Sequence, residues 1–329
     1  VNGRSPLPIF GLSNNTLDLL SYLRYLRTVT PTMFLEFNAS FSRKTNNQVW
    51  PLSAEKDWAS EIGFIGGTTS PVARGLPQFE ATGYIILGPA YDVPKIWTYN
   101  NYQYTGSMTW IKGRHTMKYG GDLLRYQYFS RSFGDTRGRL AFNGRFSGNT
   151  MADMLLGWAS NSRRQLDAAG PYHLVTNYSG FVQDDYKVTS SLTLNLGVRY
   201  DLMKQPREKF GAWSMFMPEL GKQVISSYGN LSKEEFDKRI AIVGSSSIIM
   251  AKDAGLPSTI TKDDNNNFAP RFGFAWRPFS RTVLRGGYGI FYGTSSLYRM
   301  DEYADTYPFS ITETFSVSGA NPLLVTASN

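Results

Sequence analysis

The sequence predicts an all-β protein, an antiparallel β-barrel that crosses a membrane, and three observations lead to this prediction. Apolar and polar side chains alternate over segments of about ten residues, which is typical of strands with one apolar face and one polar face. Short turns alternate with very long connections along the chain. Tyr and Trp cluster near the ends of the alternating segments, where a membrane barrel carries its aromatic girdles.

Composition excludes several classes of protein. The 329 residues contain no Cys, so disulfide scaffolds, thiolate zinc sites and cysteine nucleophiles are excluded. The two histidines, His115 and His173, are too far apart for a helical metal-binding pair. The net charge of +8 comes from 34 Lys and Arg scattered among 26 Asp and Glu, with no basic run longer than two residues. We therefore expect no nucleic-acid partner.

Hydropathy alone does not indicate a membrane protein. No segment reaches the ~18 apolar residues of a membrane helix, and the longest candidate, 240–251, is interrupted by Gly244 and three serines. The mean hydropathy of −0.30 is uninformative, because alternation averages out the hydrophobicity of a membrane strand. The chain opens Val-Asn-Gly-Arg, without Met or an apolar leader, so we expect a processed piece or missing ends.

The alternation is clearest over 192–201. Three leucines and Val198 share one face there, and Asn195, Gly197 and Arg199 share the other. The same period of two predicts ten or eleven strands. They are expected at about 18–29, 33–43, 98–111, 116–131, 139–146, 158–167, 172–187, 192–202, 268–277, 282–292 and 309–318.

The connections support a barrel over a soluble domain. If successive strands run in opposite directions, the four short turns all fall at one end; they are expected at 30–32, 112–115, 188–191 and 278–281. Long loops are expected at about 44–97 and 203–267. Compact soluble domains seldom carry such loops, whereas barrels have short periplasmic turns and long extracellular loops.

Two short helices are expected outside the strands. Segment 149–157 contains a small apolar patch ended by Gly157, and we expect a helical turn there, on the short-turn rim. Ser232 and Glu235 form a capping-box pattern, which predicts a helix of about ten residues inside the loop 203–267.

Several motifs together resemble a known family. They are Ala152-Asp-Met-Leu-Leu-Gly157, the segment 181–189 running into 192–200, Asn267-Phe-Ala-Pro-Arg271 continuing to Trp276, and 284–293. In this order they resemble the β-barrel region of TonB-dependent outer-membrane receptors, especially the Oar-like branch, which has a carboxypeptidase-regulatory-like N-terminal domain.

The resemblance implies a 22-stranded barrel in the outer membrane, plugged by an N-terminal domain. Such receptors import bulky solutes of the siderophore, oligosaccharide or peptide class, with energy relayed by TonB. Within 1–329 we expect a single, partial barrel region without a plug domain, a TonB-contacting segment or a closing strand in 321–329. The implied partners are outer-membrane lipid, the TonB system through the N-terminal region, and an unknown solute.

Three arginines are the candidate site residues. Arg199, Arg271 and Arg285 fall on predicted lumen faces. They could guide an anionic solute, or they could pair with lumen acids such as Glu36 or with a plug.

The other polar motifs do not predict chemistry. Asp184 and Asp185 are adjacent in a strand and point to opposite faces, so they cannot converge on one substrate. A calcium loop starting at Asp263 would need Gly where Phe268 stands. The glycine-rich segment 285–289 is not followed by a helix that could bind phosphate. We expect no catalytic, cofactor or metal site, and no enzymatic activity.

Two alternatives remain open. The first is a surface barrel that does not transport and displays 44–97 and 203–267 as adhesive or receptor loops. The second is a soluble, carbohydrate-binding β protein, in which a second layer of the chain covers the apolar strand faces.

Overall fold

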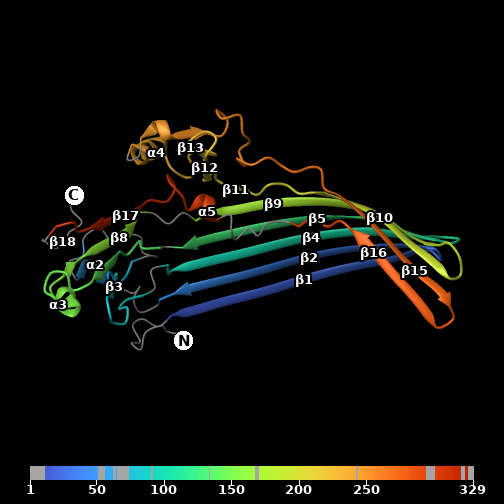
Figure 1. Ribbon diagram of the computed structural model, residues 1–329, viewed down its shortest axis with the longest axis horizontal. Helices are drawn as coiled ribbons and strands as arrows, with labels where there is room; N and C mark the ends of the chain where they lie inside the picture. Colours follow the sequence, from blue (N-terminus) through green and yellow to red (C-terminus); the bar gives the residue numbers. More distant parts are fainter. Residues whose placement is uncertain are drawn as a thin grey trace.

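A single curved antiparallel sheet dominates the computed structural model, which describes residues 12–50, 56–61, 64, 74–89, 92–132, 134–166, 170–241, 244–293, 301–319 and 323–324 (Figure 1). Eight strands follow one another in this sheet: β1 (Ser13–Thr30), β2 (Met33–Val49), β4 (Lys95–Lys112), β5 (His115–Ser132), β9 (Tyr172–Lys187), β10 (Leu192–Leu202), β15 (Phe268–Phe279) and β16 (Thr282–Gly289). The short strand β11 (Arg207–Glu208) also pairs with β9.

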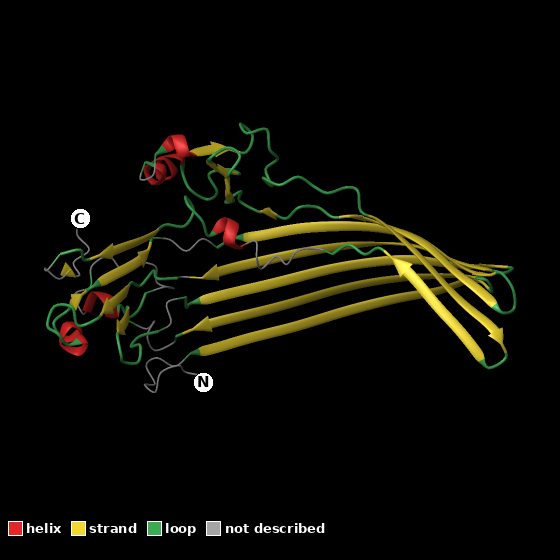
Figure 2. Cartoon of the chain, viewed as in Figure 1, coloured by secondary structure: helices red, strands yellow, loops and turns green. Residues whose placement is uncertain are grey.

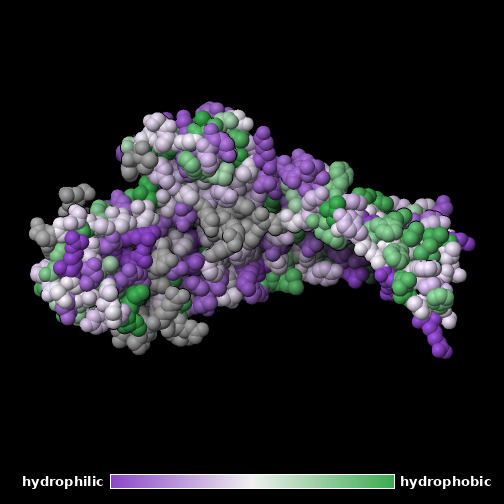
Figure 3. Space-filling model, viewed as in Figure 1, coloured by the Kyte–Doolittle hydropathy of each residue, from purple (hydrophilic) through white to green (hydrophobic). Residues whose placement is uncertain are grey.

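The strand register confirms the predicted faces. Leu194 lies opposite Phe274 and Leu196 opposite Phe272, so one face of β10 and β15 is continuously apolar. Leu196 is 42% exposed and Val198 45% exposed, so no second layer of the described chain covers this face. Hydrophobic residues lie open at the surface of the end where β15 and β16 lie (Figure 3). The sheet therefore has the arrangement of a barrel wall whose outer face meets lipid.

All four short turns lie at one end of the sheet, as predicted, and the long connections lie at the other end (Figure 2). A long-loop end and a short-turn end can therefore be distinguished. In the described part of the chain, no helix is long and apolar enough to cross a membrane.

A small sheet at the long-loop end corrects three of the strand predictions. It pairs β17 (Thr312–Ser316), β8 (Asn161–Gln165), β6 (Arg139–Phe142) and β3 (Gln78–Ala81), in that order. The segments 139–146, 158–167 and 309–318 thus contribute strands to a loop domain, whereas β5 pairs directly with β9 in the barrel wall. Alternation does not separate these cases, because a small loop sheet also has one buried face and one exposed face.

The helix at 149–157 is also placed differently from the prediction. The helix α3 (Thr150–Leu155) lies at the long-loop end, beside β3, β6 and β7 (Trp158–Ala159), and not on the short-turn rim (Figure 1). The loop domain also contains α2 (Trp58–Glu61), whose Ala59 belongs to its core, and β18 (Leu323–Leu324), which pairs with β7. Buried Phe64, Leu140 and Phe142 form the core of this loop domain.

The connection between β10 and β15 forms a second loop domain. It contains β12 (Ser214–Met217), β13 (Lys222–Ile225), α4 (Lys233–Ile240), the 3-10 helix η2 (Ser245–Ser247) and β14 (Ile248–Met250), and α5 (Asp301–Ala304) packs beside β12. The capping box predicted from Ser232 and Glu235 is present at the start of α4. Trp213 and Val224 are buried in the core.

A row of adjacent aromatic rings joins the second loop domain to the barrel wall. The ring centroids of Tyr99 and Tyr128 are 4.4 Å apart, Tyr128 and His173 are 6.0 Å apart, and His173 and Trp213 are 5.9 Å apart. Tyr128 and His173 are fully buried. This column anchors the loop connection against strands β5 and β9.

Candidate functional site

The candidate site is the polar face of the curved sheet, opposite the apolar face. The register places alternate residues of β2, β4, β5, β9 and β10 side by side on it. Asn38 on β2 donates one hydrogen bond to Glu36 and another to Thr105 on β4. Such a polar surface is expected of a barrel lumen.

Arg199 is the centre of the strongest network on this face. Its Nη1 lies 2.8 Å from Asp122 Oδ2 and its Nε lies 2.8 Å from Asp201 Oδ1. Its Nη2 also donates to Ser179 Oγ at 2.6 Å, and that hydroxyl donates to Asp122 at 2.9 Å. Two carboxylates therefore more than offset the charge of this guanidinium and hold it against the wall. Its partners are lumen acids, although Glu36, named as an example above, pairs with Arg24 instead at 3.0 Å.

Arg271 and Arg285 lie on the same face as Arg199, but they are not part of its ion-pair network. Both are exposed, and among the described residues neither forms an ion pair. The guanidinium of Arg271 stacks over the ring of Phe291, 4.6 Å from its centroid. The backbone brings Arg199 and Arg271 together at two shared hollows, and Arg285 lines neither of these two.

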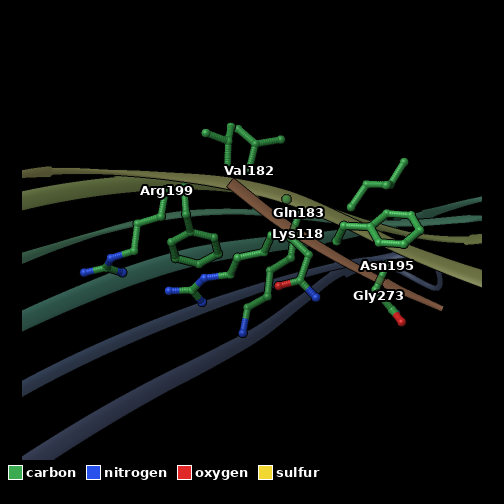
Figure 4. A pocket seen from close by; sticks show the side chains of 12 residues that line it. Lys118, Val182, Gln183, Asn195, Arg199 and Gly273 are labelled. Atoms are coloured by element: carbon green, nitrogen blue, oxygen red, sulfur yellow. The ribbon is translucent and has the colours of Figure 1, made fainter. Parts of the chain in front are cut away.

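The larger of these hollows has a volume of about 440 Å³ and is shown in Figure 4. Arg199 and Lys118 extend to one side of the sheet there, and Val182 projects to the other side. Gln183 and Asn195 add neutral hydrogen-bonding groups to the lining. The second hollow, of about 320 Å³, shares Arg199 and Arg271 with the first. The arrangement can accept an anionic or strongly hydrogen-bonding group.

Lys118 was missed in the sequence analysis. It is exposed, and in the described part of the chain it forms no ion pair. The signal that could have identified it is its parity, because it shares the polar face of segment 116–131 with Asp122.

The two adjacent aspartates do not form a catalytic pair. Asp184 lies on the apolar face and its Oδ2 is 2.6 Å from His115 Nδ1. Asp185 lies on the polar face and accepts a hydrogen bond of 2.6 Å from Asn195. Their carboxylates lie on opposite faces of the wall, as the strand alternation predicts.

The acidic segment near Asp263 has a structural role in the described part of the chain. Asp263 accepts hydrogen bonds from the Gln205 amide at 2.8 Å and from Lys204 Nζ at 2.9 Å. The Gln205 amide and then the Lys204 ammonium lower the pKa of this carboxyl below its ordinary value. Among the described residues, no three His, Asp or Glu side chains gather where they could hold a metal ion.

The curved antiparallel sheet, its exposed apolar outer face, its polar inner face and the two unequal ends define the class of outer-membrane β-barrel proteins. The chain belongs to the outer membrane beta barrel domain family, whose model matches residues 3–329. Its location is therefore the outer membrane. No curated protein matches the chain.

The family and the exposed apolar face together contradict the soluble alternative. A second layer of the chain should cover Leu196 and Val198 in a soluble β protein, and none of the described residues does. The hypothesis of a soluble, carbohydrate-binding β protein is therefore wrong.

Proposed function

We propose that this barrel belongs to a TonB-dependent receptor of the Oar-like branch, which takes up a bulky solute of the siderophore, oligosaccharide or peptide class. The observation that carries the proposal is the arrangement of the resembling motifs. The segments 181–189, 192–200, 267–276 and 284–293 occupy or extend β9, β10, β15 and β16, which are consecutive neighbours in one sheet. These four segments thus form one continuous part of the barrel wall, whereas the motif 152–157 lies at α3 in the loop domain.

The lumen supports solute binding of a particular kind. Asp122 and Asp201 together outweigh the charge of Arg199, whereas Lys118 and Arg271 bring positive charge to the same hollow without a described carboxylate at ion-pair distance. We propose that these two cations, with Arg285 farther along the wall, contact anionic groups of the solute or of a plug. We propose no catalytic role, no cofactor and no nucleic-acid partner.

Uptake by the full-length protein tests this proposal. The protein is produced in a Gram-negative host without related receptors, with and without the host's TonB protein, and labelled ferric siderophores, oligosaccharides and peptides are supplied. We expect uptake of one class, abolished without TonB. Equal uptake in both strains would contradict the proposal.

A surface protein that does not transport is the second candidate. It is favoured by the long-loop end, where two domains with their own buried cores present an ordered surface. This candidate predicts that no solute enters by a TonB-dependent route, and that deleting 214–258 abolishes adhesion of cells to their target while the barrel still assembles.

A further inference from the structure

Charges are distributed unevenly on the apolar outer face of the sheet. The register places only one carboxylate, Asp184, at the outward positions of the described barrel strands, close to the short turn that follows β9. Toward the long-loop end the outward positions carry cations and no described acid. We call four of these, all exposed, the outer-face cation patch: Arg43, Arg125, Arg207 and Lys209.

Hydrogen bonds across the strands hold this region in place. Arg43 Nε donates to Asn100 Oδ1 at 2.7 Å, and Asn100 Nδ2 donates to Gln127 Oε1 at 3.3 Å. The hydroxyl of Tyr172 donates to the same Gln127 oxygen at 3.1 Å. The ammonium of Lys209 lies 5.2 Å from the centroid of the Tyr172 ring. A chain of polar side chains thus runs from β2 across β4 and β5 to β9.

The height of the patch matches the edge of a bilayer. Arg43 and Arg125 lie equally far along their strands from the short turns at Thr32 and Arg114. With ~3.3 Å per residue and a strand tilt of about 40°, both lie roughly 25–30 Å above the turns, close to the apolar band height of about 25 Å. Phe41 and Tyr102, with ring centroids 4.9 Å apart, form an aromatic pair at this edge.

The charge of the patch is not balanced within the described chain. None of its four members forms an ion pair there, although Arg24, Arg139 and Arg164 elsewhere all do. Guanidinium groups match the geometry of phosphate oxygens, which they bind with two parallel hydrogen bonds. At headgroup level on a lipid-facing surface, the complementary anion is a lipid phosphate.

We propose that the outer-face cation patch binds phosphate groups of phosphorylated lipids in the membrane leaflet on the long-loop side. Arg43 and Arg125 contact phosphates at the edge of the apolar band, and Arg207 and Lys209 contact those that lie farther out. The occupant is a lipid rather than free phosphate, because the patch adjoins the Phe41–Tyr102 pair and the apolar wall, which contact acyl chains.

Binding of lipid A to the full-length protein in detergent micelles tests the proposal. The probes are lipid A with both phosphates, the same lipid after enzymatic removal of the phosphates, and inorganic phosphate as a competitor. The variant combines Arg43→Gln, Arg125→Gln, Arg207→Gln and Lys209→Gln. The matched control combines Arg27→Gln and Lys112→Gln, which stand at outward positions near the short turns.

We expect the patch variant to bind phosphorylated lipid A about tenfold more weakly than the native protein, and the control to be unchanged. Removing the phosphates should weaken native binding by a similar factor. Equal binding by native and variant proteins, or equal binding of both lipids, would overturn the proposal. So would competition by inorganic phosphate at the same concentration as the lipid. If the patch variant fails to fold, the pair Arg125→Gln and Lys209→Gln repeats the test, because these side chains donate none of the hydrogen bonds described above.

Discussion

Arg199 on β10 and Asp122 on β5 form an ion pair of 2.8 Å across the intervening strand β9, with the Ser179 hydroxyl between them. The pair therefore ties together three strands, not two. Asp201 completes the network by holding the Nε of the same guanidinium. On the lumen face, Arg199 therefore has a structural role, whereas the neighbouring Lys118 and Arg271 form no ion pair with described residues.

Replacing Arg199 should destabilise the barrel wall. Arg199→Ala leaves Asp122 and Asp201 without their partner, and we expect the free energy of unfolding to fall by about 1–2 kcal/mol, since the network is partly solvated. Urea unfolding of protein folded into lipid vesicles measures the change. Arg285→Ala is the control and should shift it by less than about 0.5 kcal/mol. Equal losses would show that the network does not stabilise the wall.

The two faces of β10 should respond oppositely to a new charge. Val198→Arg places a cation against hydrocarbon and should cost roughly 2–4 kcal/mol. Asn195→Arg places it in the lumen beside Asp185 and should be tolerated, because that carboxylate already binds the side chain at this position. Folding titrations into lipid vesicles compare the two variants. A similar cost for both would refute the assignment of lipid-facing and lumen-facing sides.

Charge reversal should release the outermost strand of the loop sheet. Arg164 Nε lies 2.5 Å from Glu313 Oε2, and these residues are directly opposite each other on β8 and β17. Glu313→Arg puts like charges together and should weaken this pairing by about 1 kcal/mol. Hydrogen–deuterium exchange of 312–316 should then become faster. The double variant Arg164→Glu with Glu313→Arg should restore slow exchange; failure of the swap would indicate that another contact holds β17.

The start of α4 should depend on pH. The backbone amide and the hydroxyl of Ser232 lower the pKa of Glu235 below its ordinary value. A carboxyl with a lowered folded-state pKa stabilises the helix above its unfolded pKa, and this contribution is lost as pH falls through the folded value.

The contribution is measured by the hydrogen–deuterium exchange rates of the backbone amides of 233–240. These rates are compared between the native protein and Glu235→Gln, after correction for the intrinsic effect of pH on exchange. We expect faster exchange in the variant at pH 7 and no difference at a pH well below the pKa of Glu235. A difference that persists in acid would exclude the ionised capping box as its cause. Ser232→Ala removes the cap itself and should cost about 1 kcal/mol.

The barrel strands were predictable because one rule determines them. Every residue of β10 that alternation assigned to the apolar face, from Leu192 to Val198, lies on that face, and the short turns fall at one end. The same rule misplaced Leu140 and Phe142, which alternate equally well inside a small loop sheet. Strand direction does not reveal this error, because 139–146 and 158–167 are two segments, and counting both as barrel strands leaves the direction of every later strand unchanged.

The sequence predicts the candidate site less completely than the strands, because it indicates which face a residue occupies but not its neighbours on other strands. Arg199, Arg271 and Arg285 were correctly placed on one face, since parity alone determines this. The pairing of Arg199 with Asp122 was not predictable, because it depends on β5 becoming the neighbour of β9 across the long connection between them. Lys118 joined the hollow for the same reason, through the register of β5 against β9. Asp201, in contrast, lies two residues from Arg199 on the same strand, and parity alone places it on the same face.

The small sheet β3–β6–β8–β17 takes its strands from three separate insertions, the last of which follows β16. Contacts so distant along the chain form late, because ordering a long loop opposes them until its ends are held together. The wall from β5 to β16 must hold those ends before β17 can reach β8. We therefore expect an antibody specific for the assembled sheet to recognise chains only after the wall has formed as far as β16, so that its binding would report how far the wall has grown.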